Sequence, residues 1–173
     1  MPGGNGLRNL LSNPERAQAL LEDMAKRWLA HDGVWFQAVE KEYGLEAAVK
    51  LDTEAWEKFT VLEAERIRRF LGLAPEGGLA VLKEALQLRL DWLANEQEII
   101  DAGEGRIVLR TNVCRVQAAR RRKNLAFFPC REVGMVQFAG FARTIDPRIS
   151  TRCLVSPPLD SPGEYYCAWE FSF

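Results

Sequence analysis

Cysteine is absent from this chain before Cys114, and histidine occurs only once, as His31. No two cysteines form a CxxC pair, and the chain has no HExxH, GxSxG, EF-hand or glycine-rich phosphate-loop pattern. These absences argue against zinc ribbons and knuckles, whose signature is the CxxC pair. They also argue against the hydrolases, calcium-binding proteins and nucleotide-binding proteins that the other motifs mark.

Long apolar runs and a strong net charge are missing as well. No run is long enough to span a bilayer, and residues 1–6 lack the charged-then-apolar pattern of a signal peptide. The formal net charge is -1, which indicates neither nucleic acid nor an anionic membrane as a partner. We therefore expect a cytoplasmic protein with reduced cysteines. Two structural disulfides are the alternative.

The apolar periodicity predicts an α+β fold. The 173 residues, 47% apolar and 27% charged, are typical of a soluble globular protein. After a flexible tail over residues 1–11, we expect one domain over 12–173, with a helical part (12–93) and a sheet-containing part (94–173). The N-terminal helices should pack with a roughly four-stranded antiparallel sheet that is interrupted by one or two helices. The predicted helices cover 14–43, 45–71, 79–92, 117–123 and 129–145, and the strands lie in a 98–114 hairpin and at 149–155 and 165–173.

Aromatic residues are plentiful, with 5 Trp and 9 Phe, so a cavity lined by rings is feasible. We expect the following rings in or near the core, some of them lining that cavity: Trp35, Phe36, Phe138, Phe141, Tyr165, Trp169 and Phe171. The acidic side chains of the long helices, Glu40 and Glu63 among them, have the spacing of ordinary exposed helix residues.

The four cysteines, Cys114, Cys130, Cys153 and Cys167, are the main candidates for a site. Alternation places Cys153 and Cys167 on the apolar faces of two strands that we expect to be neighbours. Cys130 lies in the first turn of a predicted helix, where the dipole favours the thiolate. The four thiols are candidate ligands for a soft cation such as zinc. Inert core cysteines are the competing interpretation, and a catalytic Cys130 is the third.

His31 interrupts an aromatic stretch of the first long helix, next to Asp32 and Gly33. A lone histidine in such a stretch is more often structural than functional. Its functional interpretation is a general base or a ligand that joins the cysteines. Asp32 would then orient the ring, or is simply solvated. Gly33 would bend the helix or admit a ligand closely.

A basic cluster runs over residues 120–123, with Arg115 upstream. A solvated helix face is the favoured interpretation. In the alternative interpretation, Arg120 binds a carboxylate or phosphate group of a ligand. Together with Trp35, Phe36 and Trp169, Arg120 completes the candidate set of ligand-binding residues.

Several short segments resemble an uncharacterised family of bacterial and archaeal cytosolic proteins, and the likeness covers nearly the whole chain after residue 12. The segments that carry it are DGVWF (32–36), EKEYG (40–44), CRVQAAR (114–120), FPC (128–130), FARTIDPRI (141–149), PP (157–158) and CAWEF (167–171). The family has no established activity.

Two weaker resemblances point to functions. The cysteine layout over residues 106–173 looks like that of the aminothiazoline-carboxylate hydrolases, which implies a hydrolase of a small cyclic amide-like or thiazoline substrate. Helices followed by an antiparallel sheet also resemble the four-vinyl-reductase domain, which implies a small-molecule pocket between helices and sheet. Transfer of activity from fold alone is analogy.

We therefore expect either a small-molecule-binding or sensing domain, with or without a cysteine-bound metal, or a hydrolase. The hydrolase would use a metal-bound water or Cys130 as nucleophile, with His31 as base. The expected partner is a small molecule. The apolar residues of the first helices suit either the core or a homodimer interface.

Overall fold

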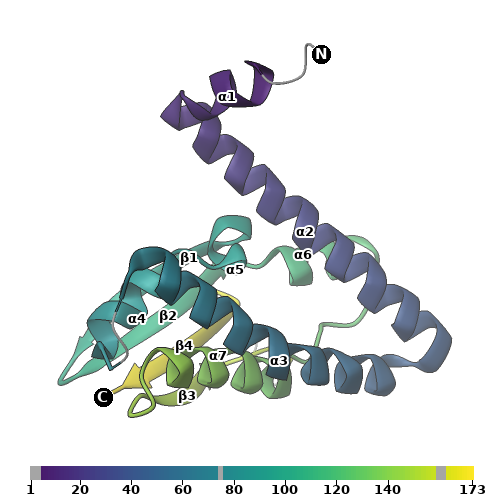
Figure 1. Ribbon diagram of the computed structural model, residues 1–173. Helices are drawn as coiled ribbons and strands as arrows, with labels where there is room; N and C mark the ends of the chain where they lie inside the picture. Colours follow the sequence, from purple (N-terminus) through teal and green to yellow (C-terminus); the bar gives the residue numbers. More distant parts are fainter. Residues whose placement is uncertain (1–4, 74–75, 159–162) are drawn as a thin grey trace.

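Two long helices joined at Gly44 dominate the first half of the protein and diverge as a V (Figure 1). The computed structural model describes residues 5–73, 76–158 and 163–173. Helix α2 (Pro14–Tyr43) begins where the Asn13 side chain accepts a hydrogen bond from the Arg16 amide at 3.0 Å, with Pro14 in its first turn. Helix α3 (Leu45–Leu71) ends at Gly72, whose φ of 65° is left-handed.

The second half builds an antiparallel sheet with helices between its strands. Strands β1 (Glu96–Gly103) and β2 (Arg106–Val113) form a hairpin, and β3 (Ser150–Val155) and β4 (Cys167–Ser172) complete the sheet in the order β1-β2-β4-β3. Helices α6 (Arg115–Arg122) and α7 (Cys130–Ile145) lie between β2 and β3 in the chain. The α+β class and the four antiparallel strands are confirmed.

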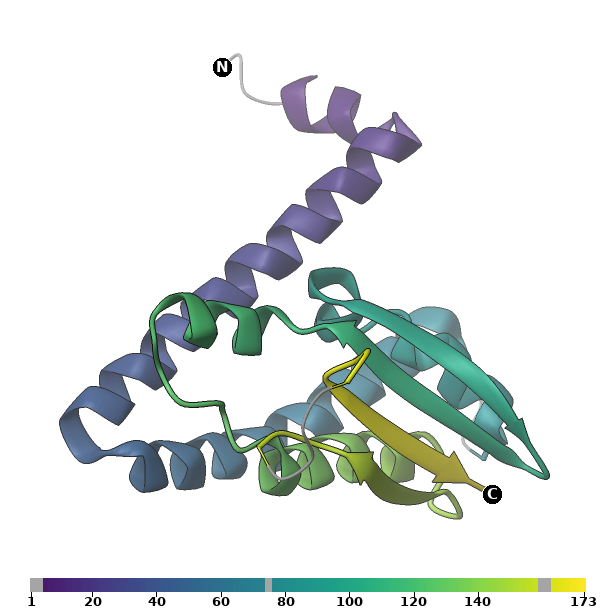
Figure 2. The same cartoon turned by 180° about the vertical axis from the view of Figure 1, so that it is seen from behind.

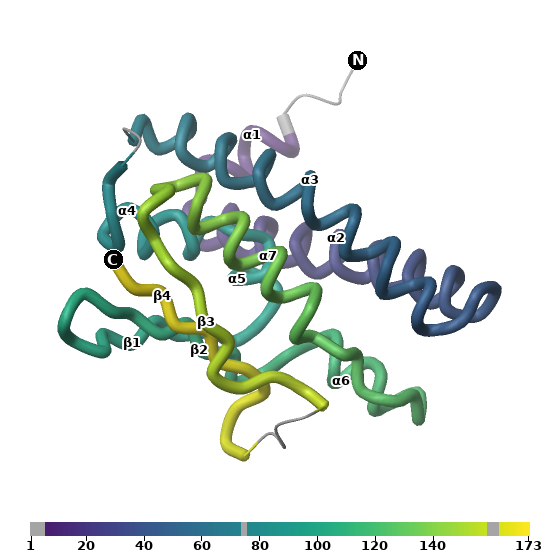
Figure 3. Tube along the Cα trace, turned by 90° about the horizontal axis from the view of Figure 1, so that it is seen from below, coloured from purple at the N-terminus to yellow at the C-terminus, as the bar shows by residue number. Residues whose placement is uncertain are grey.

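Helix α7 forms a layer between α3 and the sheet (Figure 3). The main core lies on both of its faces and includes Ala64, Phe138, Phe141, Trp169 and Phe171. Two glycines of α7 make this close packing feasible. A Cβ on Gly134 would lie 2.4 Å from Trp169 Cζ2, and one on Gly140 would lie 2.7 Å from Thr60 Cγ2.

The N-terminal half of α2 projects from the body of the molecule and carries α1 (Asn5–Leu11) at its end (Figures 1 and 2). Further along, Ala25 and Leu29 form a second, smaller core with Ala94. Helix α2 is therefore held to the body through its middle. Trp35, predicted in the core, is 65% exposed on α2, so that prediction is wrong.

Two predicted elements differ from the structure. A helix over Asn5–Leu11 replaces most of the predicted tail, and Gly6, one of the three glycines that argued against a helix, lies inside it. Gly3 and Gly4 lie outside the described residues. The predicted helix over 79–92 is two helices, α4 (Gly78–Leu86) and α5 (Leu90–Ala94). Arg89 between them is extended (φ -70°, ψ 149°), and its side chain reaches the buried carboxylate of Glu63. A buried ion pair thus interrupts a pattern that reads as one helix.

The two helix acids Glu40 and Glu63 are not ordinary exposed residues. Glu63 is buried and pairs with Arg89, and Glu40 pairs with the buried Arg120. Gly33 does not bend α2, which is continuous through it, and a Cβ there would meet nothing within 4 Å.

Candidate functional site

A cavity of about 380 Å³ opens between the V of α2 and α3 and the β2-β4 side of the sheet. Its walls come from α2, α3, α5, the sheet, α6 and α7. Figure 2 shows α6 and the segment after it running from the end of β2 past α2 to α7. Residues distant in sequence meet here because the V holds α2 away from α7. The volume is within the range of small-molecule sites.

Aromatic rings make up much of the wall. Phe36 of α2 meets Phe128 edge to face, with ring centroids 5.1 Å apart, and Phe138 of α7 lies 4.9 Å from Trp169 of β4. Trp56 of α3 is a further lining ring. Three of these, Phe36, Phe138 and Trp169, were predicted in or near the core, and all three line the cavity.

Three of the four cysteines, Cys114, Cys130 and Cys167, line the cavity, and the fourth, Cys153, does not. None of the four forms a disulfide in the described part of the chain. Strands β3 and β4 are neighbours, as predicted, and Cys153 pairs in register with Trp169, two residues from Cys167. Cys153 and Cys167 therefore occupy one face of the sheet as diagonal neighbours.

Burial keeps the lining thiols in their neutral form. It raises the pKa of Cys114 to about 12 and raises the pKa values of Cys130 and Cys167 as well. Electrostatic repulsion from Cys114, Cys167 and Cys153 adds to this effect at Cys130, so the other three cysteines are near enough to interact with it. The predicted lowering of the Cys130 pKa at a helix start is wrong, because desolvation outweighs the dipole.

No group of three or more His, Cys, Asp or Glu side chains within residues 5–73, 76–158 and 163–173 has the arrangement of a metal site. Zinc at the cysteines remains a prediction.

Three aspartates from three different helices also line the cavity: Asp32 of α2, Asp52 of α3 and Asp91 of α5. Burial raises the pKa of each, and to about 7 for Asp52. The charge of Asp91 raises the pKa values of Asp32 and Asp52, and the charge of Asp32 raises that of Asp52. The three carboxyl groups are therefore near enough for their charges to interact, and we call this part of the wall the acidic end of the cavity.

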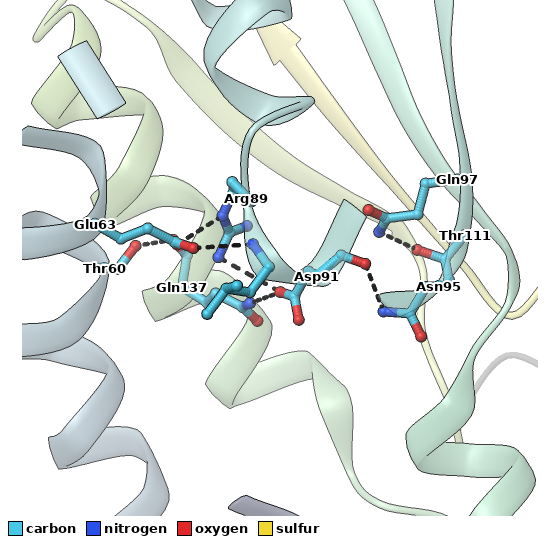
Figure 4. A network of polar contacts seen from close by, with 9 residues as sticks. Thr60, Glu63, Arg89, Asp91, Asn95, Gln97, Thr111 and Gln137 are labelled. Carbon is cyan, nitrogen blue, oxygen red and sulfur yellow. Dashed lines mark hydrogen bonds and ion pairs between the residues drawn. The ribbon is translucent and has the colours of Figure 1, made fainter. Parts of the chain in front are cut away.

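A buried polar network holds Asp91 in place (Figure 4). Arg89 donates from Nε to Glu63 at 2.9 Å, and its Nη2 lies 3.5 Å from Asp91 Oδ2. Gln137 of α7 donates to the same Asp91 oxygen. Arg89 also lies over the Phe138 and Phe141 rings, at 5.3 and 4.7 Å. The network ties α3, α5 and α7 together behind the acidic end of the cavity.

A second network shapes the wall around α6. The Arg120 guanidinium forms two hydrogen bonds with the Glu40 carboxylate, at 2.7 and 2.8 Å, and another with the Ala126 carbonyl. Arg120 is buried, so the predicted solvated face is wrong at this residue. Gln117 Nε2 donates to the Phe128 carbonyl at 2.8 Å and to Cys130 Sγ at 3.0 Å. These hydrogen bonds position the segment after α6, which carries the lining residues Phe128 and Cys130.

The indole nitrogen of Trp169 is buried without a hydrogen-bond partner in the described structure. Trp169 itself is 1% exposed and lines the cavity. The nearest acceptor to this N–H is the Cys167 thiol, and the contact lowers the pKa of Cys167, which burial raises more strongly. A thiol sulfur is a weak acceptor, and the contact does not have the geometry of a hydrogen bond, so the donor keeps its capacity for a stronger acceptor. An orphaned buried donor is uncommon in a folded protein, and at a cavity wall it suits an acceptor on a bound molecule.

His31 and Trp35 lie outside the cavity wall. Both are exposed on α2, next to lining residues such as Asp32. The proton-transfer role of His31 therefore remains a prediction without a lining contact behind it. Asp52 and Asp91 were missed, since no motif or spacing connects positions 32, 52 and 91.

The extent of the match to a known family is decisive for the identity of the chain. The model of a family of unknown function, DUF6125, matches residues 10–173. The chain belongs to this family. That agrees with the likeness to an uncharacterised family seen in the sequence. No curated protein and no solved structure matches the chain, so the likenesses to aminothiazoline-carboxylate hydrolases and to the four-vinyl-reductase domain stay predictions.

None of the helices in the described part of the chain is long and apolar enough to cross a membrane.

Proposed function

We propose that this protein binds a small organic molecule in the cavity between the α2–α3 V and the sheet. The observation that carries the proposal is the unpartnered indole N–H of Trp169, buried in the wall of a cavity of about 380 Å³. A bound molecule with an acceptor atom would satisfy that donor. Rings of Phe36, Phe128 and Phe138 would cover its apolar surface.

Two features favour binding over hydrolysis. The thiols of the wall are neutral at physiological pH, since burial raises their pKa values, and a neutral thiol is a poor nucleophile. His31, the expected base, is exposed and outside the wall. The sensing role, the zinc ion and the homodimer are further expectations that this proposal does not need.

A fragment screen with a residue-specific signal tests the proposal. The full chain, labelled with 15N, is exposed to a library of fragments. Fragments of about 10–20 heavy atoms suit the volume of the cavity. Binding in the cavity should shift the Trp169 indole signal, which is assigned by its loss in Trp169→Phe. The same fragments should fail to bind Ala30→Trp, which places a ring at the cavity wall.

Ala38→Trp is the matched control, because Ala38 is exposed on the same helix and does not line the cavity. It should bind the fragments as the parent does. The proposal is wrong if no fragment shifts the Trp169 signal, or if Ala30→Trp and Ala38→Trp bind equally well.

A further inference from the structure

The acidic end of the cavity lacks balancing charge. Asp91 shares its charge with Arg89, whose Nη2 lies 3.5 Å away. Within the described residues, no lysine or arginine forms an ion pair with Asp32 or Asp52. The charge of the exposed His31 acts on Asp32, and the Trp56 side chain donates to Asp52. Two carboxyl groups at a cavity wall therefore have no full cationic partner.

Trp56 adds an aromatic face to this end of the cavity. It lines the wall beside Asp52, and its ring meets Trp28 and Phe59 edge to face at 6.3 and 5.4 Å. These neighbours hold the indole in place. A fixed indole face next to two carboxyl groups is an arrangement that attracts a cation by both its charge and the ring quadrupole.

The orphaned Trp169 indole N–H is an independent sign of a ligand in the same cavity. This N–H can donate a hydrogen bond to an acceptor on a ligand, whereas the aspartates can bind a hydrogen-bond donor or a cation. Trp169 and the three aspartates line one and the same cavity, so one bound molecule can reach both. A molecule that carries both kinds of group would meet them together.

Basic residues also line the cavity, but they balance this end only weakly. Arg120 pairs with Glu40, Lys26 with Glu22, and Lys123 bonds Gln37. Arg115 and Arg122 are exposed, so water and salt screen their charges. At equal distance, a charge pair at an effective dielectric of 20 is about four-fold stronger than one in water. The half-buried aspartates thus dominate the selection of a ligand.

We propose that the cavity takes an organic cation, a protonated amine with an apolar or aromatic body, whose ammonium group lies between Asp32 and Asp52 beside Trp56. This inference rests on the proposed small-molecule site and specifies its ligand class. The ammonium would replace the missing counter-charge, the body would lie along the rings, and an acceptor on it would reach the Trp169 N–H.

Three probes of similar shape and different charge test this inference at pH 8, where the carboxyl groups ionise more fully. The probes are 2-phenylethylamine, 2-phenylethanol and 3-phenylpropanoate, titrated against the full chain and followed by calorimetry and the Trp169 indole signal. The amine should bind at least about ten-fold more tightly than the alcohol, and the carboxylate most weakly. Asp32→Asn and Asp52→Asn should each weaken amine binding at least about five-fold and leave the alcohol unchanged.

Asp23→Asn is the matched control, since Asp23 is exposed on α2 and pairs with Arg27. It should leave all three affinities unchanged. Equal binding of amine and alcohol, a preference for the carboxylate, or an intact amine affinity in both aspartate variants overturns the cation and leaves the small-molecule site standing. Absence of binding by all three probes overturns the cation too, and the Ala30→Trp fragment comparison then judges the site separately.

Discussion

Charged side chains that are buried in pairs are the main surprise at the scale of single residues. Arg89 is 1% exposed and Arg120 3% exposed, although arginine is usually at the surface. Each is matched by one glutamate of a long helix, Glu63 or Glu40. A buried charge is costly unless it is paired and hydrogen-bonded, so each glutamate stabilises the fold mainly by preventing an unpaired arginine.

Replacement of Glu63 by glutamine tests this account. Glu63→Gln keeps the shape of the side chain and removes the charge opposite Arg89. We expect the free energy of unfolding to fall by about 3 kcal/mol, as for one partner of a buried pair, in urea denaturation followed by circular dichroism. The double variant Glu63→Leu with Arg89→Met should recover only part of the loss, because it leaves the buried Asp91 without the arginine that pairs with it.

Glu57→Gln makes the same chemical change at an exposed position of α3. It should alter the free energy of unfolding by no more than about 0.5 kcal/mol. Equal effects of Glu57→Gln and Glu63→Gln would contradict the structural role of the Glu63–Arg89 pair.

Close packing of α7 is the main feature at the scale of elements. Gly134 lets the helix approach Trp169 of β4, and Gly140 lets it approach Thr60 of α3, whose Oγ1 donates to the Gln137 carbonyl at 2.6 Å. The position of α7 in turn determines where Gln137 and Phe138 face the cavity. Helix α7, packed tightly between α3 and the sheet, therefore holds this part of the cavity wall in a fixed position.

Two glycine-to-alanine changes should have opposite effects on stability. In Gly134→Ala the added carbon would lie 2.4 Å from Trp169 Cζ2, and Trp169 is too buried to withdraw. We expect a loss of about 1–3 kcal/mol in the free energy of unfolding, typical of overpacking. The Trp169 indole signal should shift as well.

In Gly33→Ala the added carbon meets nothing within 4 Å in a continuous helix. It should raise the free energy of unfolding by up to about 1 kcal/mol, because alanine favours the helix. Thermal unfolding of the two variants checks the signs, and a stabilised Gly134→Ala would show that α7 has more room than the structure indicates.

At the scale of the whole molecule, three helices bring three carboxyl groups together and give the fold a distinctive pH dependence. Asp52 has a pKa of about 7 in place of 3.8 because of burial and its acidic neighbours Asp32 and Asp91. The folded state therefore binds more protons than the unfolded state between these values. Stability consequently falls as the pH rises through this window.

Asp52→Asn should remove much of this loss. Asparagine mimics the neutral form, so the variant should gain stability relative to the parent as the pH rises from about 4 to about 7, and the gain should level off above that. We expect it to reach at least about 1 kcal/mol, since one unit of pKa shift corresponds to about 1.4 kcal/mol. Chemical denaturation at pH 4, 6 and 8 measures it.

Asp23→Asn, on an exposed part of α2, should follow the parent at all three pH values. A gain for Asp52→Asn that is constant with pH would refute the raised pKa. Groups with lowered pKa values act in the opposite direction. Hydrogen bonds from Arg148 hold the pKa of the buried Asp146 low, and Arg120 lowers that of Glu40, so stability should also fall upon acidification below about pH 4.

Local signals in the sequence determined most of the elements. Helices were predicted from the Asn13-Pro14 start and the stops at Gly44 and Gly72, and strands from the alternation over 149–155 and 165–173. Their boundaries agree with the structure within a few residues. Such signals depend on backbone geometry and on which face of an element is apolar, and both are written into short stretches of chain. The same signals singled out the cysteines as candidate site residues. Besides Trp56, four aromatic residues line the cavity, and three of these were also predicted, because they lie on apolar faces.

Only the tertiary structure decided which of these residues share a cavity. It separated Trp35 and His31 from Phe36 on one helix, because rotation about the helix axis determines which side chains face inward. It broke the predicted 79–92 helix at Arg89 because Glu63, far away in the chain, offers a buried partner. It assembled Asp32, Asp52 and Asp91 from three helices. Ion pairing, desolvation and helix rotation depend on contacts across the whole fold, and no local pattern specifies them.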